Sequence, residues 1–382
     1  MKSLLITFDY PPIVSGISTF FYNVWKLLPP QDYLILAPRT KDYKRVDLNS
    51  GFKIYRYCTF MSWRLMRVVI VFVYALTLIV REKIDILICG VPVSLGFVGL
   101  LLYKTIKIPY LVFYYGGEFN KYRKRTILFK LLQVVLRNAR FIITNSEFTS
   151  QEVLKFDVDA QRVIKITPGT NTERFRPGLD SGNLKERFLL EGKKVLLTVA
   201  RLARRKGIDS VISVLPRVIA QVPNIVYLVV GSGEDADYLK SLVREKSLEE
   251  HVIFVGAVTD EELPLYYNAC DVYVMPNRKT EGQEVLEGFG ISFIEANACA
   301  KPVIGGTSGG VKDAVLDGQT GLLVDSNSKA LLADSIIRLV KDNEYANKLG
   351  NNGQQRIEKE FRWGDRAQRM KEIIRRVHQE DD

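Results

Sequence analysis

The chain has 382 residues, 47% of them hydrophobic and 25% charged, and this composition excludes a disordered chain. Its net charge is +11, and the basic excess lies in one half: residues 1–180 hold 26 Lys and Arg against 13 Asp and Glu, whereas the remainder holds 28 against 30. A one-sided positive field attracts anions, which leaves nucleic acid, anionic lipid or an anionic substrate as the partner.

Short β-branched runs alternate with longer helical patterns along the first half of the chain. We expect strands at Leu4–Phe8, Tyr33–Ala37, Lys53–Tyr57, Ile84–Cys89, Tyr110–Tyr114, Phe141–Thr144 and Val163–Ile166. The helical patterns between them are Ile17–Leu28, Trp63–Val80, Ser94–Tyr103 and Thr126–Arg137. The apolar run Val68–Val80 is too short to span a membrane, and Gly and Pro residues interrupt the longer run Ile86–Tyr103.

The second half repeats this alternation. Its expected strands are Val195–Ala200, Ile225–Val230, Val252–Val255, Val272–Met275, Pro302–Ile304 and Gly321–Val324. A polar stretch containing Pro and Gly, residues 168–192, marks the boundary between the halves. Strand–helix alternation predicts two doubly wound α/β domains with parallel sheets, which hold a ligand in a cleft at the carboxyl ends of their strands.

Cysteine and histidine are sparse and scattered, which argues against metal and histidine chemistry. The four cysteines, Cys58, Cys89, Cys270 and Cys299, lack metal-site spacing and suit a reducing compartment. The acidic pair Asp157 and Asp159 fits a polar turn, and the two histidines offer no triad. The opening apolar run is too short for a signal peptide, so we expect a cytoplasmic protein without a metal site.

The segment EGFGISFIEANACA, Glu287 to Ala300, combines two carboxylates with glycines before a helical pattern. Carboxylates accept hydrogen bonds from hydroxyls, and a glycine turn at a helix N-terminus offers N–H groups to an anion. Glu287 and Glu295 can therefore bind a polyol beside a phosphate. The alternative is a helix-capping acid followed by a solvated glutamate.

Two further turns follow strands and can meet phosphate. The loop RLARRKG places Arg201 and Lys206 after an expected strand, where cations can grip phosphate oxygens; the alternative is a solvated basic loop. In TFDYPPIVSGIS, Gly16 lets backbone approach a ligand, although this turn taken alone favours a plain strand–helix connection. The GSGEDA run from Gly231 matches a dinucleotide-binding pattern, but its acids would repel a pyrophosphate, so an oxidoreductase is disfavoured.

In this order the motifs resemble those of the retaining GT-B glycosyltransferases of family GT4, over nearly the whole chain. The motifs are the YPP…G turn, PYLVFYYGGE, NSEFTSQEVLKF, ITPGTNTERFRP, RLARRKG, VVGSGE, VGAV, the two glutamates eight positions apart, and GGTSGGVKDAV. The segment MPNRKTEGQEVLEGFGISFIEA is most similar to the phosphatidylinositol-mannoside mannosyltransferase branch. The resemblance implies transfer of a sugar from a nucleotide-sugar, mannose from GDP-mannose more than a UDP-sugar, to a lipid-linked or anionic acceptor. The alternative is a UDP-sugar-dependent enzyme of the same family with a soluble acceptor.

The resemblance also implies roles for individual residues. Arg201 and Lys206 would hold the donor diphosphate, and Glu287 would bind the sugar hydroxyls. The other donor-binding residues would be Gly16 at the phosphates, Gly231 and Val258 near the nucleoside, the backbone of Phe289, Gly290 and Ile291 beside the sugar, and Glu295 at the ribose. The family needs no metal or cofactor beyond the nucleotide-sugar, because the two cations take that electrostatic part.

The acceptor side departs from the family at one position. Many relatives have His-Gly where this chain has Tyr115-Gly116, and a phenol cannot act as an imidazole. We assign Asp9, Tyr115 and Glu118 to the acceptor side. The implied domains are residues 1–178 for acceptor and membrane, residues 179–362 for the nucleotide-sugar, and residues 363–382 as a helix that returns to the first domain.

Lys121 to Arg140 holds seven cations and no acid, interleaved with Ile127, Leu128, Phe129, Leu131 and Leu132. This pattern fits a basic amphipathic helix on an anionic membrane, and equally a packed helix with a solvated basic face. Nucleic acid is disfavoured because no recognised binding module appears. The sequence thus predicts an enzyme bound peripherally to the inner face of the cell membrane.

Overall fold

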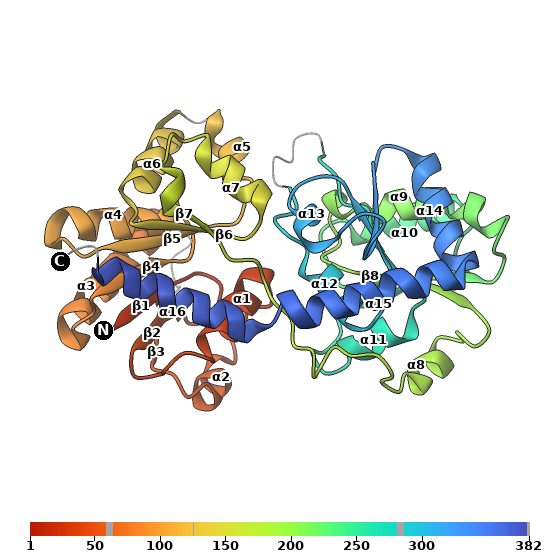
Figure 1. Ribbon diagram of the computed structural model, residues 1–382, viewed down its shortest axis with the longest axis horizontal. Coiled ribbons are helices and arrows are strands. Elements are labelled where there is room, and N and C mark those ends of the chain that lie inside the picture. Colours follow the sequence, from red (N-terminus) through yellow and green to blue (C-terminus); the bar gives the residue numbers. More distant parts are fainter. Residues whose placement is uncertain (59–63, 125, 281–285, 380–382) are drawn as a thin grey trace. The chain divides into compact units, whose positions relative to one another are not determined.

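The computed structural model describes residues 1–58, 64–124, 126–280 and 286–379, and the chain forms two compact units (Figure 1). Unit 1 comprises Met1–Pro168 together with Trp363–Asp382, and unit 2 comprises Gly169–Arg362. The chain passes from unit 1 to unit 2 between Pro168 and Gly169, before the domain boundary expected at residue 178. The reason is that Thr170 donates its N–H to the Phe361 carbonyl and Phe175 is buried in the core of unit 2.

Unit 1 is built on a seven-stranded parallel sheet in the order β3-β2-β1-β4-β5-β6-β7. The strands are β1 (Ser3–Ile6), β2 (Tyr33–Pro38), β3 (Ile54–Tyr57), β4 (Ile86–Cys89), β5 (Tyr110–Tyr114), β6 (Phe141–Thr144) and β7 (Val163–Lys165). Because β1 pairs with both β2 and β4, the order reverses there, and loops that follow strands on either side meet at one sheet edge.

Helices cover both faces of this sheet. They are α1 (Gly16–Trp25), α2 (Tyr43–Asn49), α3 (Arg64–Glu82), α4 (Ser94–Ile106), α5 (Glu118–Arg123), α6 (Thr126–Asn138), α7 (Glu147–Leu154), the 3₁₀ turn η1 (Ala160–Arg162) and α16 (Trp363–Gln379). Alternate strand residues face opposite sides: Leu4 packs with α3, α4 and α6, whereas Leu5 packs with α1 and α16. No helix within the described ranges is long and apolar enough to cross a membrane.

Helix α16 completes unit 1 although unit 2 separates it in the chain from the other parts. Met370, Ile374 and Val377 are buried in the core that α1 shares, and Trp363 meets the Phe20 ring edge-on. Arg366 also donates to the Thr167 hydroxyl at 2.7 Å. Figure 1 shows α16 in blue beside the strands of the first unit.

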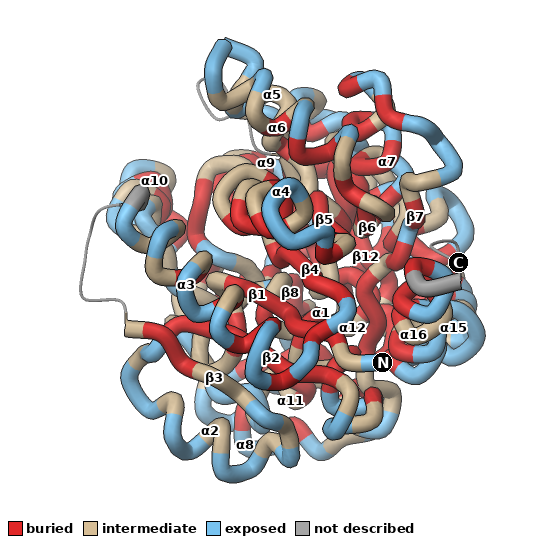
Figure 2. Tube along the Cα trace, turned by 90° about the vertical axis from the view of Figure 1, so that its left-hand side faces the viewer, coloured by how far each residue is buried: buried red, intermediate tan, exposed pale blue. Residues whose placement is uncertain are grey.

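Unit 2 has a six-stranded parallel sheet in the order β10-β9-β8-β11-β12-β13. Its strands are β8 (Lys194–Val199), β9 (Ile225–Val230), β10 (Val252–Gly256), β11 (Val272–Met275), β12 (Val303–Gly306) and β13 (Gly321–Val324). Its helices are α8 (Gly182–Arg187), η2 (Arg204–Lys206), α9 (Ile208–Ile219), α10 (Ala236–Glu245), α11 (Leu263–Ala269), α12 (Ile291–Ala298), α13 (Val311–Ala314), α14 (Lys329–Lys341) and α15 (Asn343–Glu360). Figure 2 shows strands such as β1, β4 and β8 buried, as expected for sheets covered on both faces.

The fold class predicted from the sequence is confirmed: both units are doubly wound α/β structures with parallel sheets. The basic stretch from Lys121, however, is not one helix. It divides into α5 and α6, with Arg125 outside the described residues. Leu132 is fully buried, and Phe129 packs against Phe119, so most of the apolar side of α6 belongs to the core of unit 1.

Candidate active site

The candidate donor site lies where β8, β9, β11 and β12 of unit 2 reach their carboxyl ends. The loop after β9 approaches the loop after β8 so closely that a Cβ on Gly231 would lie 2.0 Å from the Ala200 carbonyl oxygen. The end of β12 is tied to the loop after β11, because the Gly306 N–H donates to Asn277 Oδ1 at 3.0 Å. Four strand ends therefore share one compact edge.

Backbone contacts hold Glu287 at this edge. The Gly310 N–H donates to the Glu287 carbonyl oxygen at 2.8 Å. Gly309 has a φ of +76°, and a Cβ there would lie only 2.3 Å from the same oxygen. The glycine-rich loop after β12 thus fits against the segment before α12, and a side chain at Gly309 would push Glu287 away.

Two cations meet the Glu287 carboxylate on one oxygen. Lys206 Nζ lies 2.5 Å and Arg205 Nη1 lies 3.0 Å from Oε2 of Glu287, whose side chain is only 13% exposed. Burial by itself raises the pKa of Glu287, but the two cations and their hydrogen bonds outweigh it, so the pKa is lowered. The carboxylate therefore stays ionised at neutral pH and can accept hydrogen bonds from hydroxyls.

The turn η2 fixes the direction of its three cations. The Arg278 N–H donates to the Arg205 carbonyl at 2.9 Å, and the Arg204 N–H donates to Asp235 Oδ2 at 2.7 Å. The Arg204 guanidinium lies over the Tyr238 ring. Arg204 is therefore used in packing, whereas Arg205 and Lys206 face Glu287 and carry the positive charge of the site.

Arg201, which was expected to bind the donor diphosphate together with Lys206, lies in a different position from Lys206. Its side chain is 68% exposed, and its Nε lies 2.9 Å from Oε2 of Glu234. The acids that argued against a pyrophosphate at the GSGEDA run are thus paired with cations from the loop after β8. The structure brings Lys206 together with Glu287 and places Arg201 beside Glu234.

Helix α12 begins at Ile291, directly after Gly290, which serves as its N-cap with a φ of +92°. The first turn of a helix presents free backbone N–H groups, which suit an anion. Glu295, on the second turn, accepts a hydrogen bond of 2.8 Å from the Tyr267 hydroxyl. Burial raises the pKa of Glu295 to about 7, although this hydrogen bond lowers it.

Of the remaining donor residues assigned from the sequence, Phe289 and Val258 pack in unit 2, whereas Gly16 is exposed in unit 1. Phe289 is 2% exposed in the core beneath α12, and Val258, after β10, packs half-buried against the same core. In unit 1, Gly16 begins α1, whose N-cap Ser15 accepts the Ser18 N–H at 3.0 Å. These positions supply backbone and shape more than charged groups.

The acceptor-side residues of unit 1 follow β1 and β5. Asp9 accepts a 3.2 Å hydrogen bond from the Ser15 hydroxyl, which lowers its pKa, although burial has the larger effect and raises it. Tyr115 stacks on Phe113 with ring centroids 5.9 Å apart. Burial raises the pKa of Tyr115, and the nearby charges of Asp9 and Glu118 add to this effect, so the three side chains form one polar cluster.

Two polar atoms of this cluster lack a partner among the described residues. The Tyr115 hydroxyl and Oε2 of Glu118 are both buried and make no hydrogen bond there. Burial raises the pKa of Glu118 to about 8. Unpaired buried polar atoms cost free energy, so they are explained well by a ligand whose hydroxyl would pair with them.

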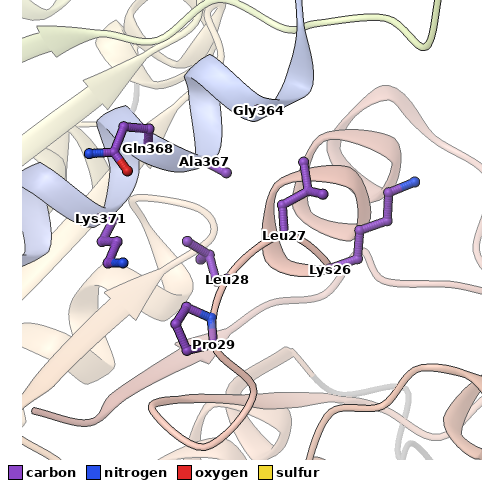
Figure 3. A pocket seen from close by; sticks show the side chains of 8 residues that line it. All are labelled: Lys26, Leu27, Leu28, Pro29, Gly364, Ala367, Gln368 and Lys371. Carbon is purple, nitrogen blue, oxygen red and sulfur yellow. The ribbon is translucent and has the colours of Figure 1, made fainter.

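The described residues show no metal site, and a hollow in unit 1 lies away from the acceptor-side residues. No group of three or more His, Cys, Asp or Glu in the described parts of the chain is arranged to hold a metal ion. A hollow of about 540 Å³ in unit 1 lies between the end of α1 and the start of α16 (Figure 3). It is lined by Lys26, Leu27, Leu28, Pro29, Gly364, Ala367, Gln368 and Lys371, and it is at the far end of α1 from Gly16.

Comparison with known families agrees with this geometry. Residues 14–174 match the family model described as Glycosyltransferase Family 4, and residues 181–356 match the model described as Glycosyl transferases group 1. The chain belongs to the family 4 glycosyltransferases. Apart from Asp9, the candidate residues of this glycosyltransferase lie inside the two matched segments.

Two curated relatives are similar to the glycosyltransferase over almost their whole length. A GDP-mannose-dependent α-(1-6)-phosphatidylinositol monomannoside mannosyltransferase of Mycolicibacterium smegmatis is 27% identical, over 97% of each chain. A GDP-mannose-dependent monoacylated α-(1-6)-phosphatidylinositol monomannoside mannosyltransferase of Corynebacterium glutamicum is also 27% identical, over 98% of this chain and 97% of the relative.

Solved structures identify the fold of the glycosyltransferase as GT-B. Sucrose-phosphate synthase from Thermosynechococcus elongatus has a TM-score of 0.84 at 24% identity and covers 99% of both chains. Anabaena HepE in complex with UDP and glucose has a TM-score of 0.83 at 19% identity, covering 98% of this chain and 99% of that one. At these identities the likeness establishes the fold of the glycosyltransferase alone.

Sequence reasoning missed Arg205 and Tyr267. Arg205 stands in the RLARRKG loop, whose density of cations was noticed, but a linear pattern does not tell which of three consecutive cations faces the carboxylate. Tyr267 lies on α11, and only the packing of α11 against α12 brings its hydroxyl to Glu295 of the glycosyltransferase.

Proposed function

We propose that this glycosyltransferase moves mannose from GDP-mannose to a hydroxyl of a lipid-linked, anionic acceptor, with retention of the anomeric configuration and without a metal ion. The observation that carries the proposal is the ionised, buried Glu287 with Lys206 and Arg205 on one of its oxygens. The two relatives are GDP-mannose-dependent phosphatidylinositol monomannoside mannosyltransferases, which supports the choice of GDP-mannose and of a phosphatidylinositol-type acceptor.

The donor half of the reaction needs charge stabilisation. When the bond between the sugar C1 and the diphosphate breaks, negative charge grows on the leaving phosphate. Lys206 and Arg205 are positioned by η2 before the reaction and would stabilise that charge without reorganisation. Arg201, at the surface beside Glu234, would reach the diphosphate after leaving that ion pair.

Two carboxylates would orient the donor. Glu287 would accept hydrogen bonds from the sugar hydroxyls, and Glu295 from the ribose hydroxyls. In both cases the carboxylate is buried, so a hydroxyl that pairs with it is shielded from competing water. The N–H groups at the start of α12 would face the phosphates.

The acceptor half would use the cluster of Asp9, Tyr115 and Glu118. The acceptor hydroxyl would attack C1 from the side of the leaving group and pass its proton to a phosphate oxygen of the donor, so configuration is retained. The Tyr115 hydroxyl, unpaired among the described residues, would donate to the sugar or the acceptor.

A thermal-shift panel of GDP, UDP, GDP-mannose and UDP-glucose tests the donor. A ligand at 100 times its Kd stabilises the folded protein by about 2.7 kcal/mol, so GDP and GDP-mannose should raise Tm clearly. Stabilisation by the UDP compounds alone would overturn the mannose assignment. Absence of any shift, together with absence of sugar transfer, would overturn the nucleotide-sugar function itself.

A further inference from the structure

Helix α3 of unit 1 carries its charges only at its two ends. Arg64 and Arg67 lie in its first turn, and Arg81 and Glu82 close it. The thirteen residues 68–80 between them contain no charged side chain. A surface helix of a globular protein normally shows a polar face opposite its buried stripe, so α3 lacks the usual solvent-facing side.

The inner face of α3 explains only part of this apolar run. Val71, Ala75 and Leu78 are buried in the core between the helix and the sheet. Five of the fourteen large hydrophobic residues exposed among the described residues lie on the other side of the same helix: Met66, Val69, Val73, Tyr74 and Val80. Along α3 exposed residues alternate with less exposed ones, and Figure 2 colours the helix by this exposure.

These side chains form one surface. Met66, Val69, Val73 and Val80 follow each other at spacings of three, four and seven residues, so they share a helix face. Helix α4 packs against α3 and adds exposed Ile106 near its end. A contiguous exposed apolar surface of this kind marks a site that another apolar phase or molecule covers.

The charges around this surface are positive. Arg81 and Lys83 are exposed at the end of α3, and Lys104 and Lys107 are exposed at the end of α4, where both lie over the Tyr103 ring. The neighbouring acid Glu82 is buried and paired with Lys53 and, at 3.4 Å, with Arg81, and Asp85 accepts the Lys2 backbone N–H. Cations around an apolar face complement anionic headgroups above an acyl layer.

We propose that the exposed face of α3 is a membrane-contacting surface that places Met66, Val69, Val73 and Val80 in the acyl boundary of an anionic bilayer. Lys104, Lys107 and Arg81 lie at headgroup level, and the half-buried aromatic ring of Tyr103 lies beside them. The basic segment of α5 and α6 then adds attraction, whereas α3 provides the insertion, because the apolar side of α6 is mostly used in the core.

The test is sedimentation of the full chain with vesicles of phosphatidylcholine, with or without phosphatidylglycerol. The double variant Val69→Asp/Val73→Asp should lower the partition coefficient on anionic vesicles by about tenfold or more, since two exposed apolar side chains that would enter the acyl layer become charged. Leu331→Asp on α14 is the matched control, because Leu331 is 54% exposed against 55% for Val69 and 53% for Val73. Its binding should equal that of the wild type.

Charge and folding controls accompany the double variant. Lys104→Gln/Lys107→Gln should remove most of the preference for anionic over neutral vesicles while leaving circular dichroism and Tm unchanged. Donor-induced thermal shifts should be the same in wild type and α3 variant, so a failure of this surface is distinguishable from a failure of the proposed glycosyl transfer.

Several outcomes overturn the proposal. One is binding of Val69→Asp/Val73→Asp to anionic vesicles as strong as that of the wild type. Another is loss of binding in Ile127→Asp on α6 while the α3 variant still binds. Absence of vesicle binding by the wild type would overturn it too. A dimer in sedimentation velocity that Val69→Asp/Val73→Asp converts to monomer would assign the face to a second copy of the chain instead.

Discussion

Nζ of Lys206 lies 2.5 Å from Oε2 of Glu287, although 80 residues separate them in the chain. Both side chains are largely buried, so each stabilises the charge of the other where water does not. The pair joins the turn after β8 to the segment before α12. It thus couples the cation proposed for the phosphate to the carboxylate proposed for the sugar.

Removing one partner of this pair should affect both rate and stability. Lys206→Met should lower kcat/KM by about 100- to 1,000-fold, as for loss of a preorganised charge donor. It should also lower the free energy of unfolding by roughly 1–3 kcal/mol, because the buried carboxylate keeps only Arg205. Chemical denaturation and transfer assays measure the two effects.

The double variant Lys206→Met/Glu287→Gln separates them. It should regain most of the lost stability, since the buried carboxylate that kept only one cation is gone. It should not regain any of the lost kcat/KM. Lys194→Met is the control, because Lys194 pairs only loosely, at 3.9 Å, with Asp271. A double variant as unstable as Lys206→Met alone would contradict the coupling.

Gly309→Ala should displace Glu287. Both Gly309 and Gly318 have positive φ, so alanine costs about 1–2 kcal/mol of backbone strain at either position. Only at Gly309 would the new Cβ meet the Glu287 carbonyl; at Gly318 no atom lies within 4 Å. Titration calorimetry should therefore show weaker nucleotide-sugar binding for Gly309→Ala, and unchanged binding for Gly318→Ala.

Glu295 should make stability depend on pH. Its pKa is raised from the ordinary 4.5 to about 7, so the folded state holds the proton more tightly than the unfolded state. The resulting stabilisation is complete below about pH 4.5 and is lost as the pH rises through about 7. The Gln side chain of Glu295→Gln stays neutral and keeps an oxygen for Tyr267. The variant should therefore not lose stability as the pH rises through about 7.

Thermal unfolding of Glu295→Gln and wild type from pH 4 to 8.5 measures the effect. The variant should gain several degrees relative to wild type across this window, since about 1 kcal/mol shifts Tm by roughly 2–4 °C at this size. Glu249→Gln, at an exposed turn, should follow the wild type throughout. A constant difference between Glu295→Gln and wild type would refute the raised pKa.

Tyr115→Phe should separate function from stability. Its hydroxyl is buried and unpaired among the described residues, so removing it should leave Tm unchanged or slightly higher. Transfer to the acceptor should fall by roughly 3- to 10-fold, the value of one hydrogen bond, while hydrolysis of the donor stays constant.

Tyr110→Phe is the matched control for Tyr115. The Tyr110 hydroxyl donates to the Val135 carbonyl at 2.6 Å, so its loss should lower Tm without a selective effect on transfer. If Tyr115→Phe behaved like Tyr110→Phe, the hydroxyl would have a structural partner and its assignment to the acceptor side would fail.

The strands were predictable because each is a short β-branched or apolar run between turn residues, such as Ile225–Val230, and parallel pairing follows from the helices between them. Helix α2 was not predicted, because it buries no residue and so has no apolar periodicity. Local chemistry thus identifies elements whose faces are buried.

The site was predictable by composition and less so by geometry. Lys206 and Glu287 both stood out beside strand ends, and parallel sheets bring such ends together. The direction of neighbouring cations was not predictable: Arg201 meets Glu234, while Arg205 meets Glu287. A turn of three residues, fixed by Asp235 and the Arg278 N–H, decides between them.

Trp363–Gln379 belongs to unit 1, although all of unit 2 precedes it in the chain. During synthesis, all of unit 2 is therefore made before Met370, Ile374 and Val377 of α16, which complete the core of unit 1. Until then the side of Phe20 and Phe113 that α16 covers stays open to water or to a chaperone. We expect unit 2 to fold first on the ribosome, and acceptor-side competence to arise last.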